Sequence, residues 1–175
     1  GFKPGDRVAY KGETGVMAEY TAHTPDLMFK IPDNCSFEAA AMMEVSSCAY
    51  SLVRQCVKPG DHVLISGQGC AGTFGLLFAK LAGATQIVVT DPSEFKRERA
   101  MRYGADLALD PIAVDVVKET KKLTNGKGFD VVQENVSQCS RRFIVYAVRE
   151  QSVCLGYVVS RFLLISWSFI ASLHA

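Results

Sequence analysis

The chain has 175 residues, of which 49% are hydrophobic, and it carries 19 Lys and Arg against 18 Asp and Glu. This apolar fraction is too high for a disordered chain, and the length suits one globular domain or one domain with part of another. A formal net charge of +1 gives no electrostatic reason to bind nucleic acid or an anionic membrane, so we expect neither partner.

The six cysteines show no metal or redox spacing, because no two of them are separated by only two residues. A chain this apolar can form a core without disulfides. We therefore expect reduced thiols and a cytoplasmic protein. Because the first residue is Gly1 rather than Met, we expect a processed chain or a fragment.

The first 35 residues are rich in turn-forming Gly, Pro, Asp and Asn, with short apolar runs between the turns. This pattern is typical of a small, irregular β module. The runs lie at residues 8–10, 16–18 and 27–29. Ser36 is a suitable N-cap for a helix through residues 39–43, and a second helix is predicted at about residues 46–55.

From His62 onward, predicted strands alternate with predicted helices. The strands are short and continuously apolar, as in a parallel sheet that is buried on both faces. They are expected at residues 63–65, 87–89, 107–109, 131–132 and 153–155. The helices are expected at about residues 74–81, 93–104, 113–123 and 138–149. This alternation predicts an α/β fold with right-handed crossovers and an open parallel sheet.

The basic clusters and the apolar tail are interpreted as structural features rather than as binding sites. The basic residues gather on one predicted helix and at Arg141 with Arg142, and we interpret both clusters as solvated helix faces. The helix cluster consists of Lys96, Arg97, Arg99 and Arg102. The apolar tail at residues 161–175 is too short to span a bilayer. We expect it to be a packed terminal segment or an edge strand, with a partly disordered extension as the alternative.

The sequence from Gly67 to Gly72 is a GxGxxG motif that follows a predicted strand and opens a predicted helix. In this context the motif predicts a dinucleotide-binding loop. Gly67 would allow the tight turn, Gly69 would let the backbone approach a pyrophosphate, and Gly72 would let helix and strand pack closely. The phosphates would lie at the helix N-terminus, where unpaired N–H groups and the positive end of the helix dipole meet.

Asp91 ends the second predicted strand, 19 residues after Gly72. A carboxylate at this place accepts hydrogen bonds from the adenosine ribose hydroxyls and repels a 2′-phosphate, so we predict NAD over NADP. Lys96 and Arg97 follow about one turn later and could reach the same ribose or accommodate a phosphate.

At this point the sequence resembles the medium-chain dehydrogenase/reductase superfamily, which contains the zinc alcohol dehydrogenases and their zinc-free quinone reductase relatives. The matching segments follow the family in order and spacing from Gly1 to about Ser160. Besides the glycine loop they are residues 5–8 (GDRV), 18–20 (AEY), 31–33 (IPD), 36–41 (SFEAAA), 57–61 (VKPGD), 104–106 (GAD) and 129–132 (FDVV).

The resemblance implies a Rossmann-type doubly wound sheet at residues 45–160, preceded by a partial GroES-like catalytic domain at residues 1–44. Residues 161–175 lie outside the family pattern. The resemblance also implies hydride transfer at nicotinamide C4. The cofactor-binding residues would be Gly67, Gly69, Cys70, Ala71, Gly72, Asp91 and Lys96, with Asn135 beside the nicotinamide ribose.

The resemblance also concerns zinc. The family holds its catalytic zinc with a cysteine and a histidine upstream of the segment at residues 5–8, and we expect the chain to begin after them. Glu44 lies where alcohol and polyol dehydrogenases place a further zinc group, or it is a charge at a helix end. A single carboxylate does not make a tetrahedral zinc site. The short loop at residues 10–16 replaces the family's four-cysteine lobe and resembles the quinone reductases.

We therefore predict the NAD-binding portion of a zinc-type alcohol or polyol dehydrogenase, incomplete for catalysis as given, with no catalytic residue assigned. Its substrate would be a small alcohol, polyol or carbonyl compound, and a homo-oligomer is possible. One alternative is a zinc-free quinone or enone reductase. The other alternative is a truncated, non-catalytic nucleotide-binding protein.

Overall fold

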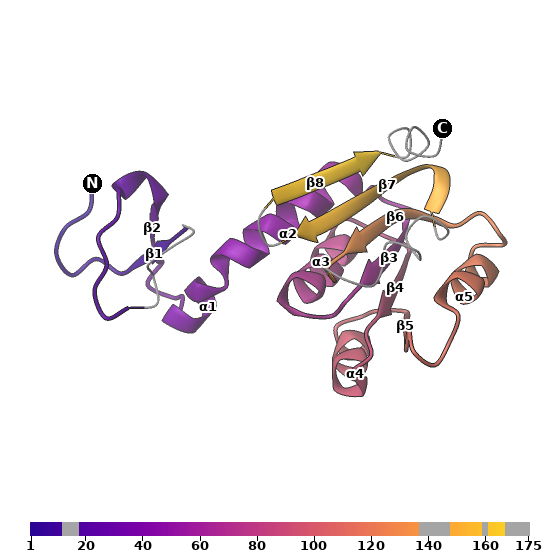
Figure 1. Cartoon of the computed structure of the whole chain (residues 1–175). Helices are drawn as coiled ribbons and strands as arrows, with labels where there is room; N and C mark the ends of the chain where they lie inside the picture. The colour runs from indigo at the N-terminus through magenta and orange to yellow at the C-terminus, as the bar shows by residue number, and fades with distance from the viewer. Residues whose placement is uncertain (12–17, 137–147, 159–160, 167–175) are drawn as a thin grey trace. The chain divides into compact units, whose positions relative to one another are not determined.

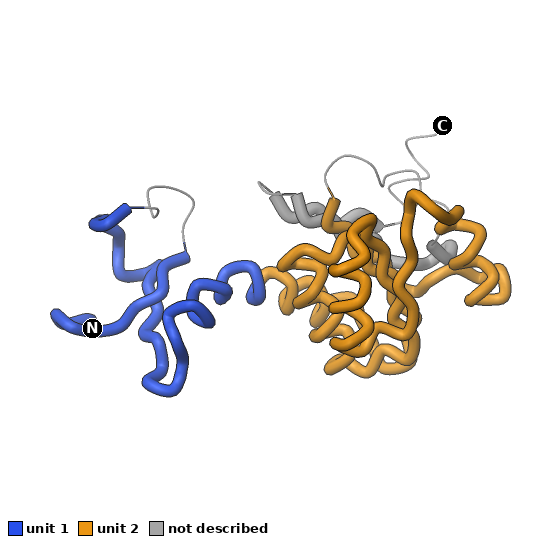
Figure 2. The backbone as a smooth tube through the Cα atoms, turned by 90° about the horizontal axis from the view of Figure 1, so that it is seen from below, with its two compact units in different colours: residues 1–47 blue, residues 48–175 orange. Residues whose placement is uncertain are grey.

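The structure is a computed structural model that describes residues 1–11, 18–136, 148–158 and 161–166. It divides into two compact units, residues 1–47 and residues 48–175 (Figure 2). The division falls within α2 (Met43–Cys56), a longer helix than the sequence predicts. The expected domain limits at residues 44 and 160 stay predictions.

The first unit contains a two-stranded antiparallel sheet and a short helix. β1 (Val8–Tyr10) pairs with β2 (Met28–Lys30), which follows the 3₁₀ turn η1 (Pro25–Leu27). As predicted, Ser36 caps the next helix, α1 (Phe37–Ala41), because its hydroxyl accepts a hydrogen bond from the Ala39 N–H. The predicted apolar run at residues 16–18 lies mostly outside the described residues.

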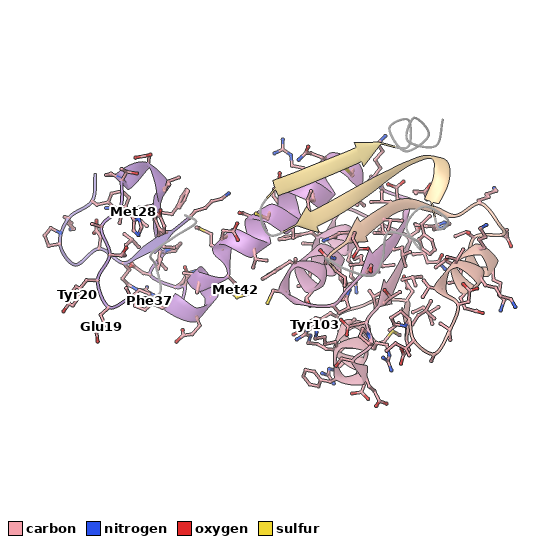
Figure 3. The ribbon with its side chains drawn as sticks, viewed as in Figure 1. Glu19, Tyr20, Met28, Phe37, Met42 and Tyr103 are labelled. Atoms are coloured by element: carbon pink, nitrogen blue, oxygen red, sulfur yellow. The ribbon has the colours of Figure 1, made fainter. Side chains whose placement is uncertain are left out.

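Arg7 connects the segments of this first unit. Its guanidinium donates to the Cys35 carbonyl at 2.6 Å and lies 4.5 Å from the centroid of the exposed Phe37 ring, which is labelled in Figure 3. Asp6 forms an ion pair with Lys30 across the small sheet at 2.8 Å. These contacts hold β2 and α1 against the chain before β1.

The second unit contains a six-stranded sheet in the order β5-β4-β3-β6-β7-β8, with α3, α4 and α5 in the connections between its strands (Figure 1). Its strands are parallel except for β8, which runs antiparallel to β7. The strands are β3 (His62–Ser66), β4 (Gln86–Thr90), β5 (Leu107–Leu109), β6 (Phe129–Glu134), β7 (Val148–Val158) and β8 (Arg161–Ser166). The helices are α3 (Cys70–Leu81), α4 (Glu94–Arg102) and α5 (Val116–Leu123).

The core lies on both faces of this sheet. Val63 and Ile65 of β3 join a cluster with residues of α2, α3 and α4, including Leu52 and Leu76. Leu64, the residue between them, joins a second cluster with Val88, Phe129 and Val132. Successive side chains of a strand point to opposite faces. This burial on both faces is the reason for the continuous apolar runs in the sequence.

Besides α1 and α2, whose bounds also differ from the prediction, two predicted helices show instructive differences. The helix predicted at 138–149 lies mostly outside the described residues, and its last two residues, Val148 and Arg149, belong to β7 instead. Val148 pairs with Phe129 in the sheet, so a long-range contact decides its conformation there. α5 begins at Val116 rather than at residue 113, because the Asp115 carboxylate caps the helix by accepting the Lys118 N–H at 3.1 Å.

The apolar tail supplies the edge strand that the sequence predicts, at least in its first part. Residues 161–166 form β8, which pairs with β7 from Val158 back to Val153. The remaining tail residues, 167–175, lie outside the described part of the chain. Within the described residues, no helix is long and apolar enough to cross a membrane.

Candidate nucleotide-binding site

The glycine motif lies at the carboxyl end of β3, between that strand and α3. The chain order of the strands reverses here, because the chain goes from β3 to β4 on one side and later returns to β6 on the other. In open α/β sheets, ligands bind at this kind of switch point, outside the carboxyl ends of the strands. The topology thus places the predicted loop where a ligand site is expected.

Two glycines of the motif are fixed by close packing. Gly67 has a φ of +83°, and a Cβ atom there would lie 2.6 Å from a methyl carbon of Val136. A Cβ atom on Gly72 would overlap the Gly67 carbonyl oxygen, because α3 passes directly against the turn that leaves β3. Both positions therefore require glycine for structural reasons alone.

Gly69 differs from the other two glycines of the motif. Its φ is −70°, which any residue adopts, and a Cβ atom there would meet nothing within 4 Å. It is exposed and forms the N-cap of α3, followed by Cys70 and Ala71 in the first turn. The first N–H groups of a helix have no partner within the helix, so they are available to an anion above this glycine.

Asp91 follows β4, and its carboxylate is turned toward the glycine loop. One carboxylate oxygen accepts the Gln68 N–H at 2.8 Å, and the other accepts the Ser93 N–H at 2.9 Å. The residue is only 5% exposed. The Lys96 ammonium lies 3.8 Å from the first of these oxygens. The structure therefore brings Asp91 and Lys96 together beside the loop.

The basic cluster on α4 is only partly a solvated face, which corrects the interpretation made from the sequence. Arg97 donates to the carbonyl oxygens of Asp91 and Pro92, both at 2.8 Å, and lies 3.3 Å from the Asp110 carboxylate. Its guanidinium thus braces the end of β4. Arg99 is also turned inward: it donates to the Gln68 carbonyl at 2.7 Å. The sequence shows that these residues are basic but not which side of the helix faces the protein.

Asn135, just after β6, connects the ends of two neighbouring strands. Its backbone N–H and its side-chain amide both donate to the Ser66 carbonyl of β3, at 3.0 and 3.1 Å. Its side-chain oxygen accepts a hydrogen bond from Gln133 at 3.0 Å. Gln133 is buried against Gly75 of α3 and was not singled out from the sequence. Asn135 therefore forms part of the wall beside the glycine loop.

Glu44, the predicted metal residue, belongs to the first unit and lies in the first turn of α2. Its backbone carbonyl accepts the Ser47 hydroxyl at 2.8 Å. Among the residues that the structure describes, no three His, Cys, Asp or Glu side chains are grouped so that they could hold a metal ion.

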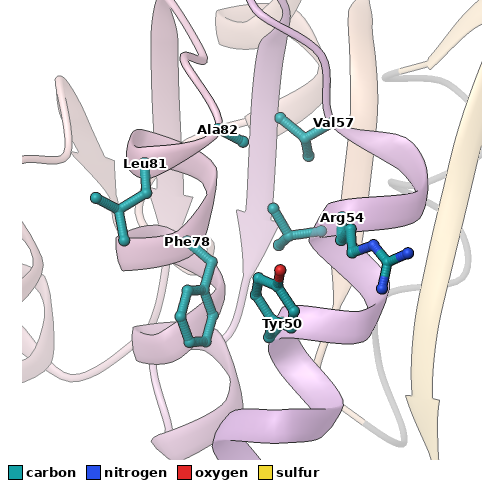
Figure 4. Close-up of a pocket in the computed structure, with 7 residues that line it drawn as sticks. Tyr50, Arg54, Val57, Phe78, Leu81 and Ala82 are labelled. Atoms are coloured by element: carbon teal, nitrogen blue, oxygen red, sulfur yellow. The ribbon is translucent and has the colours of Figure 1, made fainter.

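A shallow pocket of about 340 Å³ lies between α2 and α3 (Figure 4). Its lining is mostly apolar, and the rings of Tyr50 and Phe78 meet there edge to face with their centroids 5.4 Å apart. None of the predicted binding residues lines it. The switch point of the sheet remains the candidate site.

Known sequences similar to this chain are dehydrogenases. Residues 70–155 match the family described as zinc-binding dehydrogenase. The chain is 39% identical to the L-threonine 3-dehydrogenase of Pyrococcus furiosus over 120 residues. This aligned segment covers 69% of this chain and 34% of that enzyme. The chain thus spans about a third of the length of the curated relatives it matches.

Comparison with solved structures confirms the predicted α/β fold with a parallel Rossmann-type sheet. The quinone oxidoreductase of Pseudomonas syringae pv. Tomato DC3000 superimposes with a TM-score of 0.84 at 30% identity, covering 98% of this chain and 55% of that chain. The Escherichia coli quinone oxidoreductase complexed with NADPH superimposes with a TM-score of 0.81 at 26% identity, covering 87% and 48%.

Proposed function

We propose that this chain, which belongs to the medium-chain dehydrogenase/reductase superfamily, provides the NAD-binding site of an oxidoreductase that transfers a hydride between a small alcohol or polyol and NAD. The observation that carries the proposal is the open space above Gly69, at the N-terminus of α3 and beside Asp91. No packing contact and no backbone strain explains a glycine at this position, whereas a bound diphosphate does.

The residues around the loop fit the parts of a dinucleotide. The diphosphate would accept hydrogen bonds from the N–H groups of Gly69, Cys70 and Ala71, where the helix dipole favours negative charge. Asp91 would accept hydrogen bonds from the hydroxyls of the adenosine ribose, and Lys96 lies beside the Asp91 carboxylate. Asn135 would line the nicotinamide ribose. When bound, the nicotinamide ring supplies the hydride acceptor or donor, and the role of these residues is to bind and orient it.

The proposed preference for NAD over NADP follows from the charge and burial of Asp91. A 2′-phosphate would bring its negative charge against a carboxylate that is 5% exposed and held in place by two N–H groups. Lys96 offsets part of this repulsion, because its ammonium lies 3.8 Å from the same carboxylate.

The described residues do not fit a zinc site. A catalytic zinc takes three protein ligands, and Glu44 offers one carboxylate with no metal-binding group of three among the described residues. A role for Glu44 at zinc therefore stays a proposal, and no step through zinc is derived.

Calorimetric titration of the purified chain with NAD and with NADP tests the proposal. We expect NAD to bind more tightly, and we expect Asp91→Asn to reduce the difference between the two cofactors. Asp106→Asn is the matched control, because the Asp106 carboxylate also accepts a backbone N–H, that of Ile87 at 2.7 Å, outside the proposed site. Failure of the wild type to bind either cofactor would overturn the proposal. Equal affinities would overturn the role of Asp91.

A second candidate function is a metal-independent reduction of quinones or enones. It is favoured by the superposition on the Pseudomonas quinone oxidoreductase, which extends over 98% of this chain and so includes the first unit. Zinc content of the full-length protein and activity with NADPH and a quinone separate the two candidates. Cofactor binding without turnover of alcohols or quinones, at any zinc concentration, would favour a non-catalytic nucleotide-binding protein.

A further inference from the structure

Arg99 of α4 reaches across to the glycine loop and to α3. One nitrogen of its guanidinium donates to the Gln68 carbonyl at 2.7 Å and lies 3.2 Å from the Thr73 hydroxyl. We propose that Arg99 is a positioning residue for the cofactor diphosphate: it holds the Gln68–Gly69 peptide in the orientation that presents the Gly69 N–H to the phosphates. This inference rests on the proposed function.

Gly69 needs such a restraint more than the other glycines of the loop. Gly67 and Gly72 are fixed by contacts with Val136 and with each other. Gly69 has no atom within 4 Å of its Cβ position, and a glycine accepts nearly all backbone conformations. The Thr73 N–H donates to the Gly69 carbonyl at 3.0 Å and so holds the peptide after Gly69. The peptide before Gly69 has no such bond within the helix, and if it rotated, the Gly69 N–H would point away from the ligand.

The hydrogen bond from Arg99 supplies this restraint through peptide geometry. In a planar trans peptide, the carbonyl and the following N–H point in opposite directions. Because the Gln68 carbonyl is turned toward Arg99, the Gly69 N–H is turned away from α4. Asp91 fixes the preceding peptide in the same way by accepting the Gln68 N–H. Both peptides that flank the Gln68 Cα are therefore held by side chains from the β4–α4 segment.

The charge of Arg99 strengthens this hold. Among the described residues, Lys96 lies near Asp91 and Arg97 near Asp110, whereas no carboxylate lies within 4 Å of the Arg99 guanidinium. Its positive charge is directed to the loop carbonyl, and hydrogen bonds from a charged donor are roughly twice as strong as neutral ones. The Phe95 ring lies beside the guanidinium, with its centroid 5.9 Å from Cζ.

The test compares Arg99→Met, Arg99→Lys and the control Arg102→Met in the full chain. Arg102 is exposed, lies one turn further along the same helix and forms none of these bonds. The affinity for NAD and for adenosine, which lacks phosphates, is measured for each variant. We expect Arg99→Met to weaken NAD binding about tenfold or more, the scale of one charge-assisted hydrogen bond. Adenosine binding should stay unchanged, Arg99→Lys should recover part of the NAD affinity, and Arg102→Met should match the wild type.

The outcomes separate this inference from the proposed function. Wild-type affinity for NAD in Arg99→Met, or an equal loss for adenosine, would overturn the positioning role and leave the proposed function standing. No binding of NAD by the wild type would overturn both. A measurement on the wild type alone covers the case in which the variants do not fold: without nucleotide, the Gly69 amide should have an NMR order parameter near 0.85, typical of rigid backbone. A value below about 0.6 would overturn the inference.

Discussion

Exchanging Gly69 and Gly72 for alanine separates the proposed binding role of the loop from its structural role. At Gly72 the new methyl group would overlap the Gly67 carbonyl oxygen, which is backbone and cannot move without shifting the loop. Overpacking of this kind costs about 1 to 3 kcal/mol of folding free energy or more. At Gly69 the methyl group would enter open space at a φ of −70°. The entropic gain of alanine in the unfolded chain, about 0.4 to 1 kcal/mol, would be offset by the poorer N-cap.

The effect of the same two substitutions on cofactor binding should have a different order. A methyl group on Gly69 would occupy the space through which the diphosphate reaches the first N–H groups of α3. A hydrogen bond to a charged group contributes about 1.5 to 3 kcal/mol, so Gly69→Ala should weaken NAD binding about 10- to 150-fold. Its midpoint of urea unfolding should stay close to that of the wild type.

Urea unfolding and calorimetric titration with NAD, made on the same preparations, check both expectations. The reasoning would be refuted if Gly69→Ala bound NAD as the wild type does, because the open space would then have no ligand. It would also be refuted if Gly69→Ala unfolded as early as Gly72→Ala, since packing rather than binding would then explain this glycine.

Two further predictions concern thiol reactivity and acid stability. Burial raises the pKa of the Cys56 thiol, whereas Cys70 is exposed at the start of α3, so iodoacetamide should modify Cys70 first. NAD should slow the modification of Cys70 alone; peptide mapping that shows the same rate with and without NAD would count against the site. The hydrogen bond from Lys30 lowers the pKa of Asp6, so the stabilising effect of the carboxylate is present above its unfolded pKa. It is lost as the pH falls below about 4 through the folded value. Asp6→Asn should remove this part of the acid sensitivity, as followed by circular dichroism between pH 2 and about 6. An unchanged profile would exclude a contribution of the Asp6 carboxylate to acid stability.

The parts of the fold that depend on local sequence could be predicted from the chain alone. The strand at His62–Ser66 is an example, because its apolar run is bounded by turn residues and has no helical period. The start of β7 could not be predicted in this way. Val148 is extended because it pairs with Phe129, a residue 19 positions earlier in the chain. The sequence on either side of Val148 does not predict that contact.

The same distinction applies to the candidate site. The glycine motif and Asp91 carry their chemistry in residue type and spacing, so the sequence was sufficient to propose them. The sequence predicts a solvated face for Arg97 and Arg99, because a basic residue on a helix is usually exposed, and it also allows Arg97 to reach the adenosine ribose. In the structure, Arg97 is turned to the Asp91 and Pro92 carbonyls instead. The hydrogen bonds of both arginines to backbone carbonyls depend on how α4 is rotated against β4 and α3, which is a property of the packed domain.

The hydrogen-bond capacity of Asp91 connects the shape of the loop with the proposed preference for NAD. A carboxylate can accept about four hydrogen bonds, and the N–H groups of Gln68 and Ser93 occupy one on each oxygen. Two places remain, which equals the number of hydroxyls on the adenosine ribose of NAD. In NADP one of these hydroxyls is replaced by a phosphate, which brings no donor and adds charge. Asp91 holds the loop with the half of its capacity that faces Gln68 and Ser93. In the proposed function, the other half would recognise an unmodified ribose.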